Sequence, residues 1–111
     1  PDRGDFIAVV GNWRSSVLLR RFSRQMRRVQ GLPVETLNVF GNGILIPPAR
    51  LSDHSPFWDL GYPALMVTDT SYFRNPNYHA YSDTLETLDL KFMTKVCEGV
   101  TTGIYQLANS R

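Results

Sequence analysis

Three short apolar runs alternate with segments of helical periodicity, and this alternation restricts the possible folds more than any other feature of the sequence. The runs occupy residues 6–10, 36–40 and 63–68, and each is bounded by glycine, asparagine or proline. Helical patterns cover about residues 13–29 and 89–107, and a shorter helix is expected at Pro56. This order predicts an α/β domain, in which helices pack on the faces of a sheet.

The pattern at residues 13–29 is that of an amphipathic helix, which Gly31 and Pro33 end. Its apolar arc contains Leu18, Leu19, Phe22, Met26 and Val29. Its basic arc contains Arg20, Arg21, Arg24, Arg27 and Arg28. The basic arc is most simply the solvated face of a surface helix, and binding of nucleic acid or heparin is the alternative. The basic arc has no interleaved aromatic surface on which bases could be read, which disfavours nucleic acid as a partner.

The last helix is expected to begin after Asp89 as its N-cap. Its expected apolar stripe consists of Met93, Cys97, Val100, Ile104 and Leu107. The run at 63–68 is apolar enough for a strand in the interior of a sheet. Residues 69–88 form a long loop before the last helix, and a loop of this length in a compact domain is usually functional. We therefore expect the chemistry of the chain to lie in this loop.

Bulk composition excludes some classes of protein. No apolar stretch has the length of a membrane-spanning helix, so we expect no membrane partner. Cys97 is the one cysteine, which excludes an internal disulfide but leaves the compartment open. Residues 1–50 hold eight arginines and three acidic residues, whereas residues 51–111 hold four basic and seven acidic residues. The positive charge is therefore concentrated around residues 20–28.

The two histidines, His54 and His79, are the first candidates for metal ligands. His79 lies inside the long loop, and Asp83 follows it by four residues. A carboxylate near a ligating histidine can accept the proton of the second ring nitrogen and fix the tautomer. From the spacing alone, the simpler interpretation is that Asp83 forms a local turn with the backbone.

Three linked motifs give a more specific signal. They are Ser-Asp-His-Ser-Pro-Phe-Trp-Asp-Leu-Gly-Tyr-Pro-Ala-Leu at residues 52–65, Asn-Pro-Asn-Tyr-His at 75–79, and Ser-Asp-Thr-Leu-Glu-Thr-Leu-Asp at 82–89. In order and spacing they resemble the C-terminal signature of the co-catalytic zinc aminopeptidase family. That family also contains glutamate carboxypeptidases and glutaminyl cyclases.

The resemblance implies a fold and a set of roles. The fold would be a three-layer α/β sandwich with a mixed, mainly parallel sheet, of which residues 1–111 would be the C-terminal half. His79 would bind one of two zinc ions, and Tyr78 would line the pocket for the peptide substrate. Asp53, His54 and Asp83 would lie beside the metal ligands and support them. Zinc in such a site polarises a peptide carbonyl and activates a water molecule.

The chain also departs from the family pattern. Family members need a His-x-Asp pair and an adjacent Glu-Glu pair that supplies the general base, and neither is present. A single histidine does not hold catalytic zinc, so no residue here is predicted to be catalytic. The sequence therefore predicts part of a zinc-dependent exopeptidase that is inactive alone. It also predicts self-association, because half of a sheet leaves strand edges open.

Two alternatives remain. A glutaminyl cyclase has the same fold but typically carries an acidic residue where Ser52 stands and tryptophan where Tyr78 stands, which favours the peptidase. The other alternative is a non-enzymatic binding module that uses the basic helix.

Overall fold

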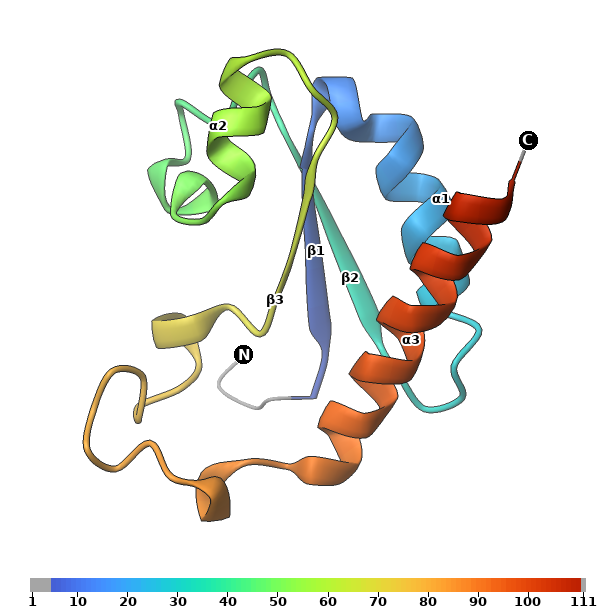
Figure 1. Cartoon of the computed structure of the whole chain (residues 1–111). Helices are drawn as coiled ribbons and strands as arrows, with labels where there is room; N and C mark the ends of the chain where they lie inside the picture. Colours follow the sequence, from blue (N-terminus) through green and yellow to red (C-terminus); the bar gives the residue numbers. More distant parts are fainter. Residues whose placement is uncertain (1–4, 111) are drawn as a thin grey trace.

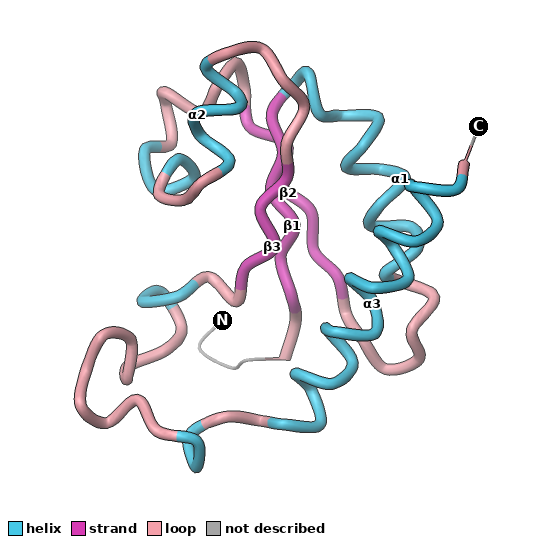
Figure 2. Tube along the Cα trace, in the orientation of Figure 1, coloured by secondary structure: helices cyan, strands magenta, loops and turns pink. Residues whose placement is uncertain are grey.

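The computed structural model describes residues 5–110, apart from the side chain of Tyr72. Three strands form one sheet, β1 (Ile7–Asn12), β2 (Val34–Val39) and β3 (Leu65–Thr68), in the order β2-β1-β3. The central strand β1 runs parallel to β2 and antiparallel to β3 (Figures 1 and 2). The mixed α/β fold expected from the sequence is confirmed, with one parallel and one antiparallel strand pair in the described part.

Helices cover both faces of this sheet. Helices α1 (Ser16–Met26) and α3 (Leu90–Asn109) lie together on one face, and α2 (His54–Asp59) lies on the other (Figure 1). The residues of β1 alternate between the two faces, as the pleat of a strand requires. Val9 belongs to the core under α1 and α3, whereas Val10 packs with Trp58 of α2. The domain therefore has three layers, with β1 in the middle of the central one.

Helix α1 forms largely as its sequence predicts. The Asn12 side chain accepts hydrogen bonds from the backbone N–H and the hydroxyl of Ser15, at 3.1 and 2.6 Å, and so starts a 3₁₀ turn that leads into the helix. Leu19, Phe22 and Met26 are buried against the sheet, and the five arginines of the opposite arc are exposed. The expected solvated basic face is confirmed.

Helix α3 begins as expected, because the Asp89 side chain accepts a hydrogen bond of 3.0 Å from the Phe92 backbone. The predicted apolar stripe is partly wrong, since Met93, Cys97 and Ile104 are exposed. The side chains of α3 that pack on the core are instead Phe92, Val96, Val100 and Leu107. The buried face is thus rotated by about one residue from the expected one.

The glycines of α3 explain this rotation. A Cβ atom on Gly103 would lie 2.6 Å from the Phe22 ring, and one on Gly99 would lie 2.9 Å from Leu32. Both positions face α1 and are buried. The two helices approach closely because these residues lack side chains, and this contact fixes which face of α3 is turned inward.

Strand β3 differs from its expected place inside the sheet. Within residues 5–110 it pairs only with β1, and all four of its residues are half-buried. The strand begins at Leu65 rather than Pro63, and the backbone N–H of Ala64 donates to the Ser15 hydroxyl at 2.9 Å. An apolar run does not distinguish an edge from an interior position, because that depends on which other strands are present. No helix in the described part is long and apolar enough to span a membrane.

We predict that Gly103→Ala destabilises the domain by about 1–3 kcal/mol, because the new methyl group overlaps the buried Phe22 ring. This cost opposes the gain of about 1 kcal/mol in helix propensity. Urea unfolding of both proteins at one concentration measures the difference. Thr101→Ala, at an exposed position of α3, is the control and should change stability by no more than about 0.5 kcal/mol. A Gly103→Ala variant as stable as the original chain would contradict the proposed close contact.

Candidate functional site

Two of the motifs found in the sequence meet at one groove on the α2 side of the sheet. The groove has a volume of about 390 Å³. Strands β1 and β3 contribute Val10 and Met66, and the loop before α2 contributes Ala49, Leu51 and Ser52. The loop after β3 closes the other side with Thr70, Ser71, Phe73 and Tyr78. The lining is mainly apolar, which suits an apolar side chain of a ligand.

Tyr78 and His79 form the part of this site that belongs to the Asn-Pro-Asn-Tyr-His motif. Tyr78 lines the groove and is 40% exposed. Its ring stacks on the His79 imidazole, with ring centres 3.9 Å apart and an angle of 15° between the planes. His79 is exposed and has a left-handed backbone with φ of 56°, a conformation in which histidine is enriched. The stacking and the turn hold the imidazole at the surface, beside the groove.

Asp83 lies on the same exposed loop. Its backbone N–H donates to the Ala80 carbonyl at 3.0 Å, which closes a main-chain turn that does not involve the Asp83 carboxylate. Among residues 5–110, no hydrogen bond joins the Asp83 carboxylate to His79. The prediction that Asp83 supports His79 therefore stays a prediction.

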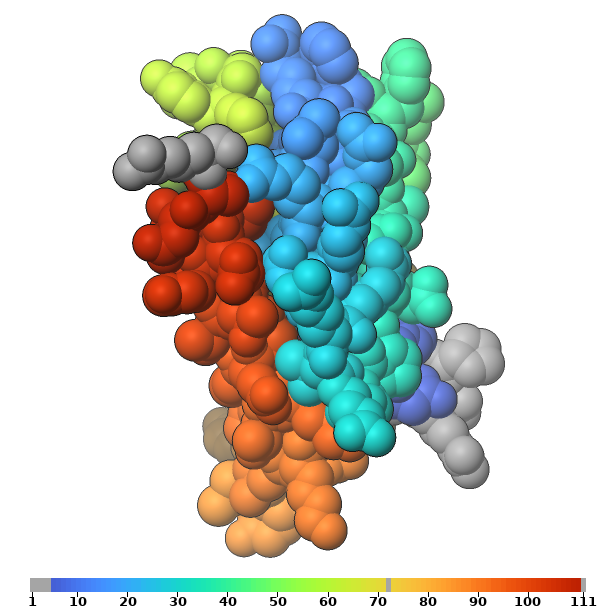
Figure 3. Space-filling model, turned by 90° about the vertical axis from the view of Figure 1, so that its right-hand side faces the viewer, coloured from blue at the N-terminus to red at the C-terminus, as the bar shows by residue number. Residues whose placement is uncertain are grey.

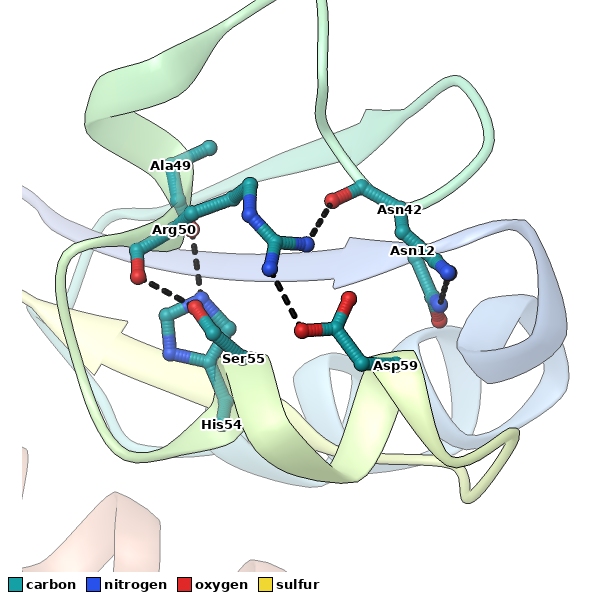
Figure 4. Close-up of polar contacts among 7 residues, drawn as sticks. All are labelled: Asn12, Asn42, Ala49, Arg50, His54, Ser55 and Asp59. Atoms are coloured by element: carbon teal, nitrogen blue, oxygen red, sulfur yellow. Dashed lines mark hydrogen bonds and ion pairs between the residues drawn. The ribbon is translucent and has the colours of Figure 1, made fainter.

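His54 is buried, and its ring is hydrogen-bonded to the backbone of the segment that forms one wall of the groove (Figure 4). Its Nε2 donates to the Ala49 carbonyl, which can only accept, so Nε2 carries the proton. Its Nδ1 is buried without a hydrogen-bond partner in the part of the chain that the structure describes. The ring meets Trp58 edge to face, with centres 4.4 Å apart. His54 thus fixes the turn Pro47–Arg50, two residues of which line the groove.

Neighbours of His54 make further hydrogen bonds to the backbone around it. The Ser55 hydroxyl donates to the Arg50 carbonyl of the same turn, and the Trp58 indole N–H donates to the Ala64 carbonyl before β3 at 2.9 Å. Asp53 immediately precedes α2 but makes no capping hydrogen bond and is exposed. Of the three residues expected to support the metal ligands, His54 is thus buried in the packing of α2 and Asp53 is exposed, while their expected roles beside a metal stay predictions.

Arg50 connects the same turn to two other segments (Figure 4). Its guanidinium donates to the Asn42 carbonyl at 2.8 Å and pairs with the Asp59 carboxylate at 2.6 Å. The hydrogen bond from Arg50 lowers the pKa of Asp59 from its ordinary value, and the bond to Asp59 raises the pKa of Arg50. Because the folded-state pKa of Asp59 is lowered, the pair stabilises the fold at neutral pH and is lost as the pH falls through that pKa.

One further carboxylate of the loop after His79 has a shifted pKa. A hydrogen bond from its own backbone N–H, and then one from the Thr84 hydroxyl, lower the pKa of Glu86. Glu86 is therefore ionised at neutral pH and adds negative charge to the loop.

The described residues do not form a complete metal site. Within residues 5–110, no three His, Cys, Asp or Glu side chains are grouped so that they could hold a metal ion. Beside the groove, the one histidine side chain exposed for metal binding in the described part of the chain is that of His79. Catalytic zinc takes three protein ligands, so this donor set does not hold zinc by itself.

Sequence reasoning missed several residues of the groove. The segment before the Ser-Asp-His motif supplies Ile46, Pro48, Ala49 and Leu51, which no sequence motif singled out. Phe73 on the opposite wall was also missed. The available signal was the unusual number of large apolar residues in a Gly- and Pro-rich loop, which a loop without function would not need.

Comparisons with known proteins give the family of the chain. Residues 7–103 match the family model described as peptidase family M28. Uncharacterized protein YfbL of Escherichia coli (strain K12) is 40% identical over 105 residues, which is 95% of this chain and 32% of that protein. The chain thus spans about a third of the length of this curated relative. A search of the solved structures gives no match.

We predict that His54→Ala destabilises the fold by about 2–4 kcal/mol, because it leaves the Ala49 carbonyl without its donor and a cavity beside Trp58. His79→Asn removes the other imidazole at an exposed, left-handed position that asparagine tolerates, so its effect should stay within about 0.5 kcal/mol. Thermal or urea unfolding of the two variants separates the packing histidine from the surface one. Equal losses of stability would contradict this division of roles.

Proposed function

This chain belongs to peptidase family M28, and from that premise we propose that it is the C-terminal half of the catalytic domain of a zinc-dependent exopeptidase of the aminopeptidase type. The family is generally zinc-dependent. The observation that carries the proposal is the meeting of Ser52 and Tyr78 at one apolar groove, with the exposed His79 stacked on Tyr78 beside it. Substrate-binding and metal-binding residues of an exopeptidase have to lie side by side in this way.

In this proposal, His79 is one ligand of a zinc ion, and the remaining ligands and the Glu base come from a segment outside residues 1–111. The exposure of the imidazole supports it, because the metal-binding nitrogen has to reach groups that are not in this chain. Zinc bound there would polarise the scissile carbonyl and activate a water molecule. The ring of Tyr78 stacks on the His79 imidazole and restrains its plane, so that this chain contributes both the ligand and the residue that orients it.

The groove is proposed to bind the side chain of the terminal residue of a peptide. Its lining by Val10, Leu51, Met66 and Phe73 favours an apolar residue, since burial of apolar surface is the main gain available there. Tyr78 contributes one aromatic wall. His54 acts indirectly, by holding Ala49 in the opposite wall.

The acidic residues near the site have subsidiary proposed roles. Asp83 is proposed to accept a hydrogen bond from His79 once the imidazole binds metal; both residues are exposed on the same loop. Asp53 is exposed next to Ser52, and we propose that it faces the segment that completes the site. A glutaminyl cyclase is less well supported, because Ser52 and Tyr78 both line the groove and neither is the residue typical of that enzyme.

Self-association of the chain is also proposed. In the described part, β2 and β3 each pair on one side only, which leaves main-chain groups open along two edges. Large apolar side chains between β2 and α2 are exposed as well, among them Phe40, Ile44, Leu45 and Leu51. A second copy, or the proposed missing half, would cover the β3 edge and these apolar side chains.

We predict that the complete polypeptide carrying this chain hydrolyses an apolar aminoacyl-anilide and that a chelator abolishes the activity. Residues 1–111 alone should show no turnover with added zinc, because one imidazole does not form the site. His79→Asn in the complete polypeptide should lower kcat by at least about 100-fold, whereas the exposed Arg28→Gln serves as the matched control and should leave it unchanged.

Two results would contradict the proposal. Chelator-sensitive hydrolysis by residues 1–111 alone would mean that this chain holds a whole site. A complete polypeptide that cyclises N-terminal glutamine but hydrolyses no peptide would identify the transferase instead.

A further inference from the structure

A second hollow lies between α1 and the edge strand β2. It is on the opposite face of the sheet from the groove lined by Ser52 and Tyr78, which we call the substrate groove because of its proposed role. The second hollow has a volume of about 540 Å³. Helix α1 lines it with three arginines, two serines and a leucine, and β2 lines it with Thr36 and Asn38. Helices α1 and α3 lie side by side on this face (Figure 3). We call this hollow the α1–β2 groove.

The α1–β2 groove is strongly basic. Arg20, Arg24 and Arg27 are four and three residues apart, so they share one side of the helix, and all three line the groove. All three are exposed. Among residues 5–110, none of them forms an ion pair with a carboxylate, in contrast to Arg50 with Asp59. The groove therefore carries three positive charges that the described part of the chain leaves unneutralised.

Part of this charge is held in place. The Arg27 guanidinium donates from Nε and Nη2 to the Val34 carbonyl, at 3.3 and 3.1 Å, which fixes it at the start of β2. Asn38, at the other end of the strand, donates to the Ser16 hydroxyl at 2.7 Å. The two ends of the groove are thus defined by hydrogen bonds between α1 and β2.

The one carboxylate of β2 does not enter this groove. Side chains alternate along a strand, and Thr36 and Asn38 line the α1–β2 groove, whereas Leu37 lines the substrate groove on the other face. Glu35 lies two residues before Leu37 and shares its face. Strand alternation thus places the nearest acidic side chain of the strand away from the arginines.

The open edge of β2 lies beside these charges. In the described part β2 pairs only with β1, so its outer main-chain N–H and C=O groups are open to a partner, apart from the Val34 carbonyl, which accepts from Arg27. A peptide in extended conformation can pair with such an edge, and its side chains on one face then reach the adjacent helix. The lining of the groove contains no aromatic residue, so it offers no surface on which nucleic-acid bases would stack.

We propose that the α1–β2 groove binds an extended peptide segment rich in aspartate and glutamate, which lies along β2 and places its carboxylates on Arg20 and Arg24. Arginine suits this ligand, because its guanidinium pairs with a carboxylate through two parallel hydrogen bonds. The inference stands on the charge and edge geometry of this face and does not depend on the proposed peptidase activity.

A binding titration of the complete polypeptide tests the proposal, with a fluorescein-labelled peptide of alternating glutamate and threonine as the probe. Arg20→Gln/Arg24→Gln should weaken binding by at least about 10-fold, because two charge-assisted contacts are lost. Arg21→Gln/Arg28→Gln removes the same charge from exposed positions that do not line the groove and should change affinity by about twofold or less. An N-methylated form of the peptide, which cannot pair with the strand edge, should also bind more weakly.

Several results would overturn it. Equal loss in the two double variants would show that only net charge matters, and absence of binding to the unaltered protein would show that no such site exists. Tighter binding of a single-stranded oligonucleotide than of the acidic peptide would assign the groove to nucleic acid. Self-association in sedimentation that the Arg20→Gln/Arg24→Gln variant abolishes would show that a second copy occupies it.

Discussion

The burial of β1 on both faces is the interaction on which the rest of the structure depends. All six of its residues are buried, and it is the strand that joins β2 to β3. Ile7 and Val9 close the core under α1 and α3, and Val10 closes the core with Trp58. Its last residue, Asn12, starts α1 and also donates to Asn42 at 3.0 Å. Both grooves therefore take their position from one strand.

The two grooves are built in different ways from this common support. The groove lined by Ser52 and Tyr78 lies between two loops. The backbone on one side of it is fixed by hydrogen bonds that the side chains of His54, Ser55 and Trp58 donate to main-chain carbonyls. The α1–β2 groove lies between two regular elements and is defined by charge and an open strand edge. Such a division leaves the loops free to carry chemistry while the helix and strand present a fixed surface.

Local signals made the strands, the cap of α3, and the basic face of α1 predictable from the sequence, because each depends on neighbouring residues. The inward face of α3 was not predictable, because Gly99 and Gly103 decide it through contacts with residues about 70 to 80 positions away. The buried role of His54 was missed for another reason: Ala49 and Trp58 are near it in the sequence, but their contacts with it arise only when the turn folds onto α2. The motif containing His79 was visible because its residues are consecutive.

The central claim is that His79 is one ligand of a zinc site whose other ligands lie outside this chain. Metal analysis of the complete polypeptide after zinc loading and dialysis tests it most directly, with the unaltered protein and His79→Asn measured in parallel. The account predicts that His79→Asn retains its fold by circular dichroism and holds one zinc ion fewer per molecule. Equal zinc content in the two proteins would contradict it.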